Sequence, residues 1–140
     1  MLIDYISKLY HKFRLMSYKN LFKQVQERDG SVSATEAFAA DVIYLLKNPT
    51  ITEFADYIGI SQPNATYKVN NLVEKGYIKK VPSVTDRREC HLEVSEKFIR
   101  YYAEYTEEFF QNIKNLDQQF TPQELEAFHK VMDAVLKISL

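Results

Sequence analysis

Residues that interrupt or crosslink a chain are scarce in this sequence of 140 residues. It holds three glycines, four prolines, one cysteine and no tryptophan. With so few helix-breaking residues, we expect long regular elements, mostly helices. The single cysteine, Cys90, excludes an internal disulfide and favours a cytoplasmic protein.

Long hydrophobic runs and catalytic motifs are also missing. No stretch approaches the roughly 18 apolar residues of a membrane span, and Asp4, Lys8 and His11 interrupt the N-terminal segment, which excludes a secretory signal. The absence of a glycine-rich phosphate loop, a nucleophile elbow and a His-Glu-x-x-His run argues against an enzyme. His11, His91 and His129 have no ligand-like spacing, so we expect neither a metal nor a cofactor.

Charge is unevenly distributed, although the net charge is only −1. Residues 61–91 hold six basic and three acidic side chains, whereas residues 95–140 hold five basic and eight acidic ones. A basic middle followed by an acidic tail fits a local footprint for nucleic-acid phosphates. A random fluctuation on a mixed surface explains the charge pattern equally well.

Apolar periodicity predicts a mainly α-helical fold with a small β-hairpin. A long helix is expected over residues 2–28, followed by a break at 29–31. A capping box of Ser33 and Glu36 starts a second helix, about 34–47, which is apolar on most sides and is therefore expected in the centre of the domain. Its large or central apolar residues are Phe38, Ala39, Val42, Ile43, Leu45 and Leu46.

The middle of the chain predicts a helix-turn-helix followed by a wing. A short helix over 51–58 ends at Gly59, and a helix over 62–75 is capped by Ser61 and ended by Gly76. Strands are expected at 77–81 and 89–94 because the second alternates apolar and polar residues.

Two further helices are expected after the wing. The first runs from a cap at Ser95 to about 117 and carries an aromatic stripe from Phe98 to Ile113. The second starts at a capping box of Thr121 and Glu124, and its apolar residues are close to a heptad seam: Leu125, Phe128, Met132 and Val135.

The helix over 62–75 has the residue types of a recognition helix. Its inward face is Ala65, Val69 and Leu72, and asparagine, glutamine, threonine and tyrosine on its other sides suit adenine and thymine edges. Lysines and the capping serine suit phosphates, and the lack of arginine favours an A/T-rich site. The predicted contacts are Ser61, Gln62, Pro63, Asn64, Thr66, Tyr67, Lys68, Asn70, Asn71 and Lys75. The alternative is an ordinary solvated polar face.

Asp86, Arg87 and Arg88 stand between the two predicted strands. An arginine at a hairpin tip can enter a narrow minor groove, where A/T sequences deepen the negative potential. The neighbouring carboxylate can hold one guanidinium in place. The pattern does not decide between the two arginines, although Arg88 is preferred, and an ordinary charged turn is the alternative.

Taken together, these motifs resemble the MarR family of bacterial winged-helix regulators. The resemblance rests on Ala55, Gly59 and Ser61, on Leu72 with the segment 75–78, and on Asp86-Arg87-Arg88 followed by residues 92–95. It implies one MarR-like domain over 1–140, with a winged core at about 34–94 and dimerisation helices at about 2–28 and 95–138. It also implies a homodimer that binds double-stranded DNA. The chain departs from the family at Phe98, where glycine is common.

Several functional alternatives stay open. The resemblance favours a repressor of a palindromic operator, released by a small-molecule effector that Tyr10, Phe13 and Phe38 would line; aromatic residues at helical spacing also fit a plain core. A winged helix used only for protein contacts is a second interpretation. A redox-sensing regulator that uses Cys90 is a third, although a free cysteine on the apolar side of a strand is commonly a small buried hydrophobe.

Overall fold

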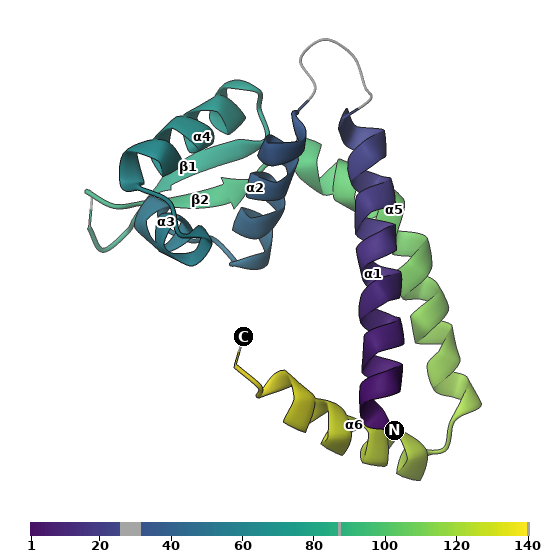
Figure 1. The fold of residues 1–140 in the computed structure, drawn as a ribbon. Helices are drawn as coiled ribbons and strands as arrows, with labels where there is room; N and C mark the ends of the chain where they lie inside the picture. Colours follow the sequence, from purple (N-terminus) through teal and green to yellow (C-terminus); the bar gives the residue numbers. More distant parts are fainter. Residues whose placement is uncertain (26–31, 87, 140) are drawn as a thin grey trace. The chain divides into compact units, whose positions relative to one another are not determined.

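The computed structural model describes residues 1–25, 32–86 and 88–139. The first helix, α1, spans Leu2–Val25, so the end of the predicted first helix and the predicted break at 29–31 lie outside the described residues. By its internal contacts the chain divides into two compact units, Met1–Tyr102 and Ala103–Leu140. Figure 1 shows the helices and the single hairpin along the chain.

The first unit contains the helix-turn-helix and the wing that the sequence predicts. After α1 come α2 (Ala34–Leu45), α3 (Ile51–Ile58) and α4 (Gln62–Glu74). The strands β1 (Ile78–Pro82) and β2 (Cys90–Val94) form an antiparallel hairpin. The predicted fold class is confirmed, and the strand limits are displaced by about one residue from those expected.

Local capping explains where the helices of this unit begin. Ser33 and Glu36 form the predicted capping box at the start of α2, and the side chain of Thr50 accepts from the backbone N–H of Glu53 to start α3. Gly59 ends α3 at a φ of 72°, a left-handed conformation that glycine adopts without strain from a Cβ atom.

One hydrophobic core lies under the winged segment. Phe54, Leu72 and Leu92 are among its fully buried side chains, and α1 joins it through the partly buried Leu21. The prediction for α2 is only partly right: Ile43 is buried, but Phe38 and Leu45 are exposed. Helical periodicity shows that α2 is apolar on several sides but does not show how many of those sides are covered.

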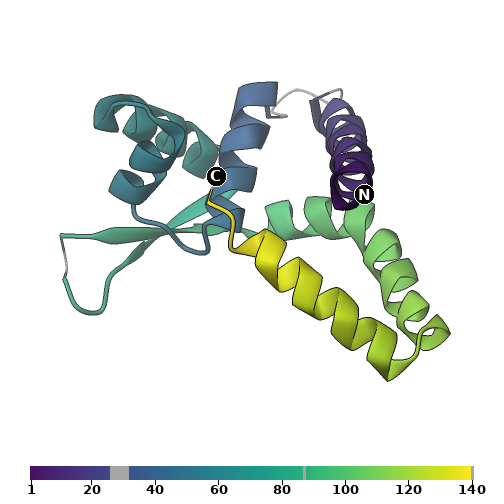
Figure 2. The ribbon, with the colours of Figure 1, turned by 60° about the horizontal axis from the view of Figure 1, so that its bottom comes forward.

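The start of β2 is joined by a short third segment that the sequence pattern did not predict. Thr50 forms an isolated bridge with His91, and the backbone N–H of Leu92 donates to the carbonyl of Pro49 at 2.8 Å. The hairpin is thereby attached to the turn that precedes α3. Figure 2 shows the two strands side by side and the loop between them extending beyond α3 and α4.

The long helix α5 (Glu96–Leu116) begins in the first unit and continues into the second. A short 3₁₀ turn, η1 (Asp117–Gln119), leads to α6 (Pro122–Leu136), which begins at the predicted capping box of Thr121 and Glu124. Within α6 no residue is fully buried. Among the helices of the described ranges, none has the length and apolar character that a membrane span requires.

Candidate nucleic-acid interface

The helix α4 separates an apolar face from a polar one. Ala65, Val69 and Leu72 are completely buried against the rest of the winged segment. The Ser61 side chain caps the helix by accepting from the backbone N–H of Asn64 at 3.3 Å. Because the buried face anchors the helix, its remaining side chains keep a fixed orientation toward the outside.

The outward residues of α4 are those that the sequence assigned to DNA. Tyr67 is 67% exposed, so its ring is available to a partner. Thr66, Lys68 and Asn71 are half-buried. The fully exposed members of the set are Ser61, Gln62, Pro63, Asn64, Tyr67 and Asn70.

The preceding helix, α3, orients the first turn of α4. Thr52 donates its hydroxyl to the Oε1 atom of Gln62 at 3.3 Å. Phe54 and Ala55 anchor α3 in the core, so the two helices of the motif are held together by packing and by a polar contact at their exposed rim.

The wing turn is organised by backbone contacts. The Asp86 carboxylate accepts from the backbone N–H of Arg88 at 2.9 Å, and the backbone N–H of Ser83 donates to the carbonyl of Glu89 at 2.9 Å. The carboxylate thus shapes the turn through the chain itself, whereas the sequence suggested that it would hold a guanidinium. Arg88 is exposed, and Arg87 lies outside the described residues.

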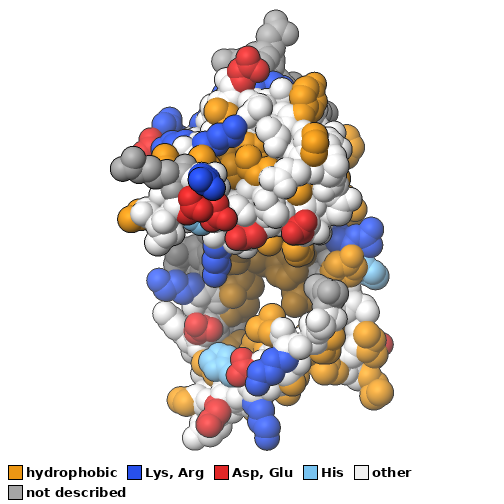
Figure 3. Space-filling model, turned by 90° about the vertical axis from the view of Figure 1, so that its left-hand side faces the viewer, with side chains coloured by type: hydrophobic (Ala, Val, Ile, Leu, Met, Phe, Trp, Pro, Cys, Tyr) orange, Lys and Arg blue, Asp and Glu red, His pale blue; other side chains and the backbone are white. Residues whose placement is uncertain are grey.

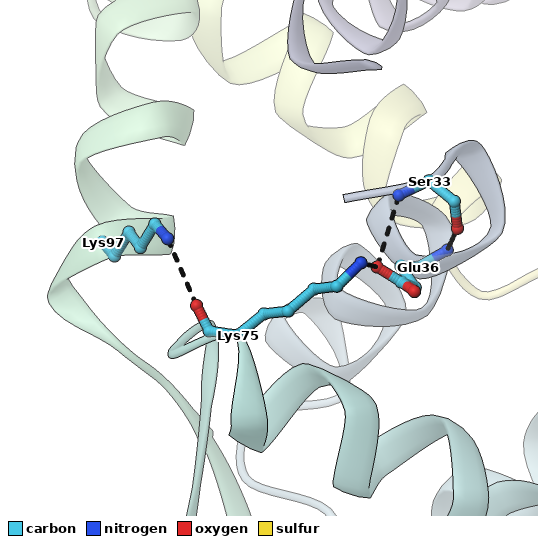
Figure 4. A network of polar contacts seen from close by, with 4 residues as sticks. All are labelled: Ser33, Glu36, Lys75 and Lys97. Atoms are coloured by element: carbon cyan, nitrogen blue, oxygen red, sulfur yellow. Dashed lines mark hydrogen bonds and ion pairs between the residues drawn. The ribbon is translucent and has the colours of Figure 1, made fainter. Parts of the chain in front are cut away.

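Lys75, assigned to phosphate from the sequence, has a partner within the protein. Its ammonium lies 2.7 Å from the Glu36 carboxylate, which also accepts from the backbone N–H of Ser33 (Figure 4). The Lys97 ammonium donates to the Lys75 carbonyl at 3.2 Å (Figure 4) and lies 4.4 Å from the centroid of the Tyr77 ring. This network ties the end of α4 to the starts of α2 and α5, a connection that spans 39 positions between Glu36 and Lys75.

A second lysine from the wing reaches the recognition helix. The Lys80 ammonium on β1 donates to the Oδ1 atom of Asn70 on α4 at 2.6 Å. Both side chains are exposed. Sequence reasoning grouped Asn70 with the base-reading residues and gave Lys80 no individual role, because the contact depends on how the hairpin packs against the helix.

The remaining candidates lie away from α4. Tyr10, Phe13 and Phe38 all expose part of their rings, and Tyr10 is also contacted by the guanidinium of Arg14. Cys90 begins β2 opposite Pro82 and is half-buried. Within the described part of the chain, no group of three or more histidine, cysteine or acidic side chains is arranged to hold a metal ion.

One ionisable group is buried without a partner. An oxygen of the Asp41 carboxylate on α2 is inaccessible to solvent and has no hydrogen-bond partner among the described residues. Burial raises the pKa of Asp41 because it disfavours the charged form.

These features define a winged helix-turn-helix protein, with α3 and α4 as the two helices and β1 and β2 as the wing. The family model described as MarR family matches residues 32–89. This segment, which includes both helices and most of the wing, belongs to the MarR family, and the resemblance seen in the sequence is confirmed.

Solved structures share the fold over nearly the whole chain. FabT from Streptococcus pneumoniae, crystallised with DNA, has a TM-score of 0.60 at 19% identity, covering 97% of this chain and 93% of FabT. A mutant of MarR from E. coli complexed with operator DNA has a TM-score of 0.53 at 17% identity, covering 97% and 99%. A mutant of MepR from S. aureus bound to an oligodeoxyribonucleotide has a TM-score of 0.51 at 16% identity, covering 94% and 95%. No curated protein matches the sequence.

Proposed function

We propose that this protein is a sequence-specific regulator of transcription that binds double-stranded DNA as a homodimer. The observation that carries the proposal is α4: its apolar side is fully buried, while its exposed side presents the polar residues from Ser61 to Asn70 beside a wing. A helix of this length fits a major groove, and amide side chains read adenine there. The three DNA-bound relatives of the same fold support this assignment.

The proposed complex uses both parts of the winged segment. The first turns of α4 enter the major groove, and the exposed Arg88 at the wing enters a neighbouring minor groove. Since α4 in residues 62–74 carries no arginine, which supplies the commonest contact to guanine, the preferred operator is rich in A/T pairs. Two-fold symmetry makes that operator palindromic, with half-sites about one helical turn apart.

The chain acts as one MarR-like domain, with α1, α5 and α6 as dimerisation helices. Apolar side chains at the surface of the helical regions support this role (Figure 3). As a small dimer it represses by occupying a promoter. An effector that contacts Tyr10, Phe13 and Phe38 would release it, and the partial exposure of these rings supports such a contact.

In vitro selection of bound duplexes from a random pool tests the assignment. The selected site should be A/T-rich and symmetric, and Arg88→Ala should weaken binding while leaving the dimer intact. Arg100→Ala is the matched control, because Arg100 is exposed on α5, away from α4 and the wing. Selection of no sequence, with wild-type affinity in the Arg88 variant, would favour a protein-interaction module instead.

The redox alternative needs a separate measurement. Cys90 lies in the wing, so oxidation there would alter the hairpin beside α4. Its test is duplex binding before and after peroxide treatment, in the wild type and in Cys90→Ser. Equal loss of binding in both proteins would exclude Cys90 as the sensor.

A further inference from the structure

We propose that Lys80 is a contact to the DNA backbone and that Asn70 is a positioning residue for Lys80 rather than a reader of bases. The inference rests on the proposed function and assigns the cation of the wing strand that serves the recognition helix. It starts from one contact between two elements: the Lys80 ammonium donates to the Asn70 Oδ1 atom at 2.6 Å.

The register of the hairpin determines where Lys80 points. Lys80 pairs with Leu92, and Ile78 pairs with Val94, so these residues share one face of the hairpin. Ile78 and Leu92 are buried in the core, and therefore this face is the one against the helices. Lys80 follows that face with its aliphatic stem and brings its ammonium out at the exposed rim of α4.

The neighbouring lysine has a different environment. Lys79 pairs with Glu93 and therefore lies on the opposite face of the hairpin. It has the same charge, is also exposed and is one residue away. The two lysines thus differ mainly in whether they face α4.

The chemistry of the contact favours a phosphate role for Lys80. An ammonium has three donors, so one bond to Asn70 leaves two for phosphate oxygens. No carboxylate of the described residues forms an ion pair with Lys80, whereas Lys75 is paired with Glu36. Holding Lys80 in place before DNA arrives reduces the side-chain entropy that binding must remove.

The same contact changes what Asn70 can do. Bidentate recognition of adenine uses the amide oxygen as an acceptor and the amide nitrogen as a donor in one plane. In Asn70 the oxygen is engaged by a charged donor, which gives a stronger bond than a neutral one. The amide is thereby oriented by the wing, and reading of bases falls to other residues of α4, such as Asn64.

Anisotropy titrations of a selected duplex with full-length Lys80→Gln and Lys79→Gln test the first half of the inference. Lys80→Gln should weaken binding about tenfold and lower the slope of log K against log salt by about 0.9, the loss of one phosphate contact. Lys79→Gln should change affinity by less than about twofold with an unchanged slope. Lys80→Arg should restore the salt slope, and thermal unfolding checks that all variants fold.

Asn70→Ala, alone and combined with Lys80→Gln, tests the positioning role. Alone it should lose part of the affinity that Lys80→Gln loses, with unchanged sequence preference, and in the Lys80→Gln background it should have no further effect. Equal effects of Lys80→Gln and Lys79→Gln, or an altered sequence preference in the double variant, would overturn the inference while leaving the proposed function standing. Failure of the wild type to bind any duplex would overturn both.

Discussion

The winged segment and the long helices that flank it treat their apolar side chains in opposite ways. Every buried hydrophobic residue of the described chain falls between Val32 and Phe98. On α1 and α6, by contrast, large apolar side chains such as Leu9, Phe22 and Phe128 are exposed. The winged segment therefore completes its own core, whereas the flanking helices carry apolar surface that a single copy leaves in contact with water. Exposed apolar area of this kind marks an interaction site, which is why we assign it to a second copy.

The largest expected effect concerns the core of the winged segment. Phe54 on α3 is fully buried, and Phe54→Ala should lower the free energy of unfolding by about 3–5 kcal/mol, because it removes apolar contacts and leaves a cavity. Tyr57→Ala on the same helix is the control: Tyr57 is 69% exposed, so its loss should stay within about 0.5 kcal/mol. Denaturant unfolding measures both, and similar losses would contradict the comparison.

The next effect concerns the exposed apolar surface. Phe128 on α6 is 58% exposed, and Phe128→Glu should shift the protein from dimer toward monomer, because a carboxylate buried at an interface must be desolvated. Sedimentation equilibrium measures the shift. Lys130→Gln, two positions away on another side of the helix, should leave the dimer unchanged. A Phe128→Glu protein with wild-type dimer affinity would remove this part of α6 from the interface.

A smaller effect is expected where α3 ends. Gly59 has a φ of +72°, and a Cβ atom added there would meet no atom within 4 Å. Gly59→Ala should therefore cost only the left-handed backbone strain, about 1–2 kcal/mol of unfolding free energy. Gly59→Asn should cost less, because asparagine adopts this conformation more readily. A loss as large as that of Phe54→Ala would mean that the turn supports more than its own backbone.

The smallest effect sharpens the comparison inside the winged segment, since Asp41 is a charge buried beside an otherwise apolar core. Its raised pKa means that the folded state holds its proton more tightly than the unfolded state. Stability should therefore fall as the pH rises from the ordinary pKa of 3.8 through the raised folded value, and then level off. Asp41→Asn should remove that decline and be more stable than the wild type at neutral pH. Unfolding curves that stay parallel across this range would contradict the assignment.

Sequence reasoning was most accurate where the determinants are local. The caps at Ser33, Ser61 and Thr121 are side chains bonded within one turn of the helix they start, and this proximity is visible in the sequence. The inward set of Ala65, Val69 and Leu72 follows from helical periodicity alone.

It was least accurate where distant elements meet. The bridge between Thr50 and His91 and the pair of Glu36 and Lys75 join residues about forty positions apart, and no local pattern encodes them. Phe38 has the same apolar character as the buried Ile43, yet it is exposed. Which sides of α2 are covered depends on the packing of other elements, and on the proposed partner copy.

Salt-dependent binding of a selected A/T-rich duplex is the measurement that tests the central claim most directly. Because α4 and the wing are proposed to neutralise phosphates, log K should fall linearly with log salt, with a slope of about −0.9 for each phosphate contact. Two copies of the chain should bind each duplex, as a symmetric site requires. Affinity that is unchanged by salt, or the absence of duplex binding at low salt, would contradict the proposed function.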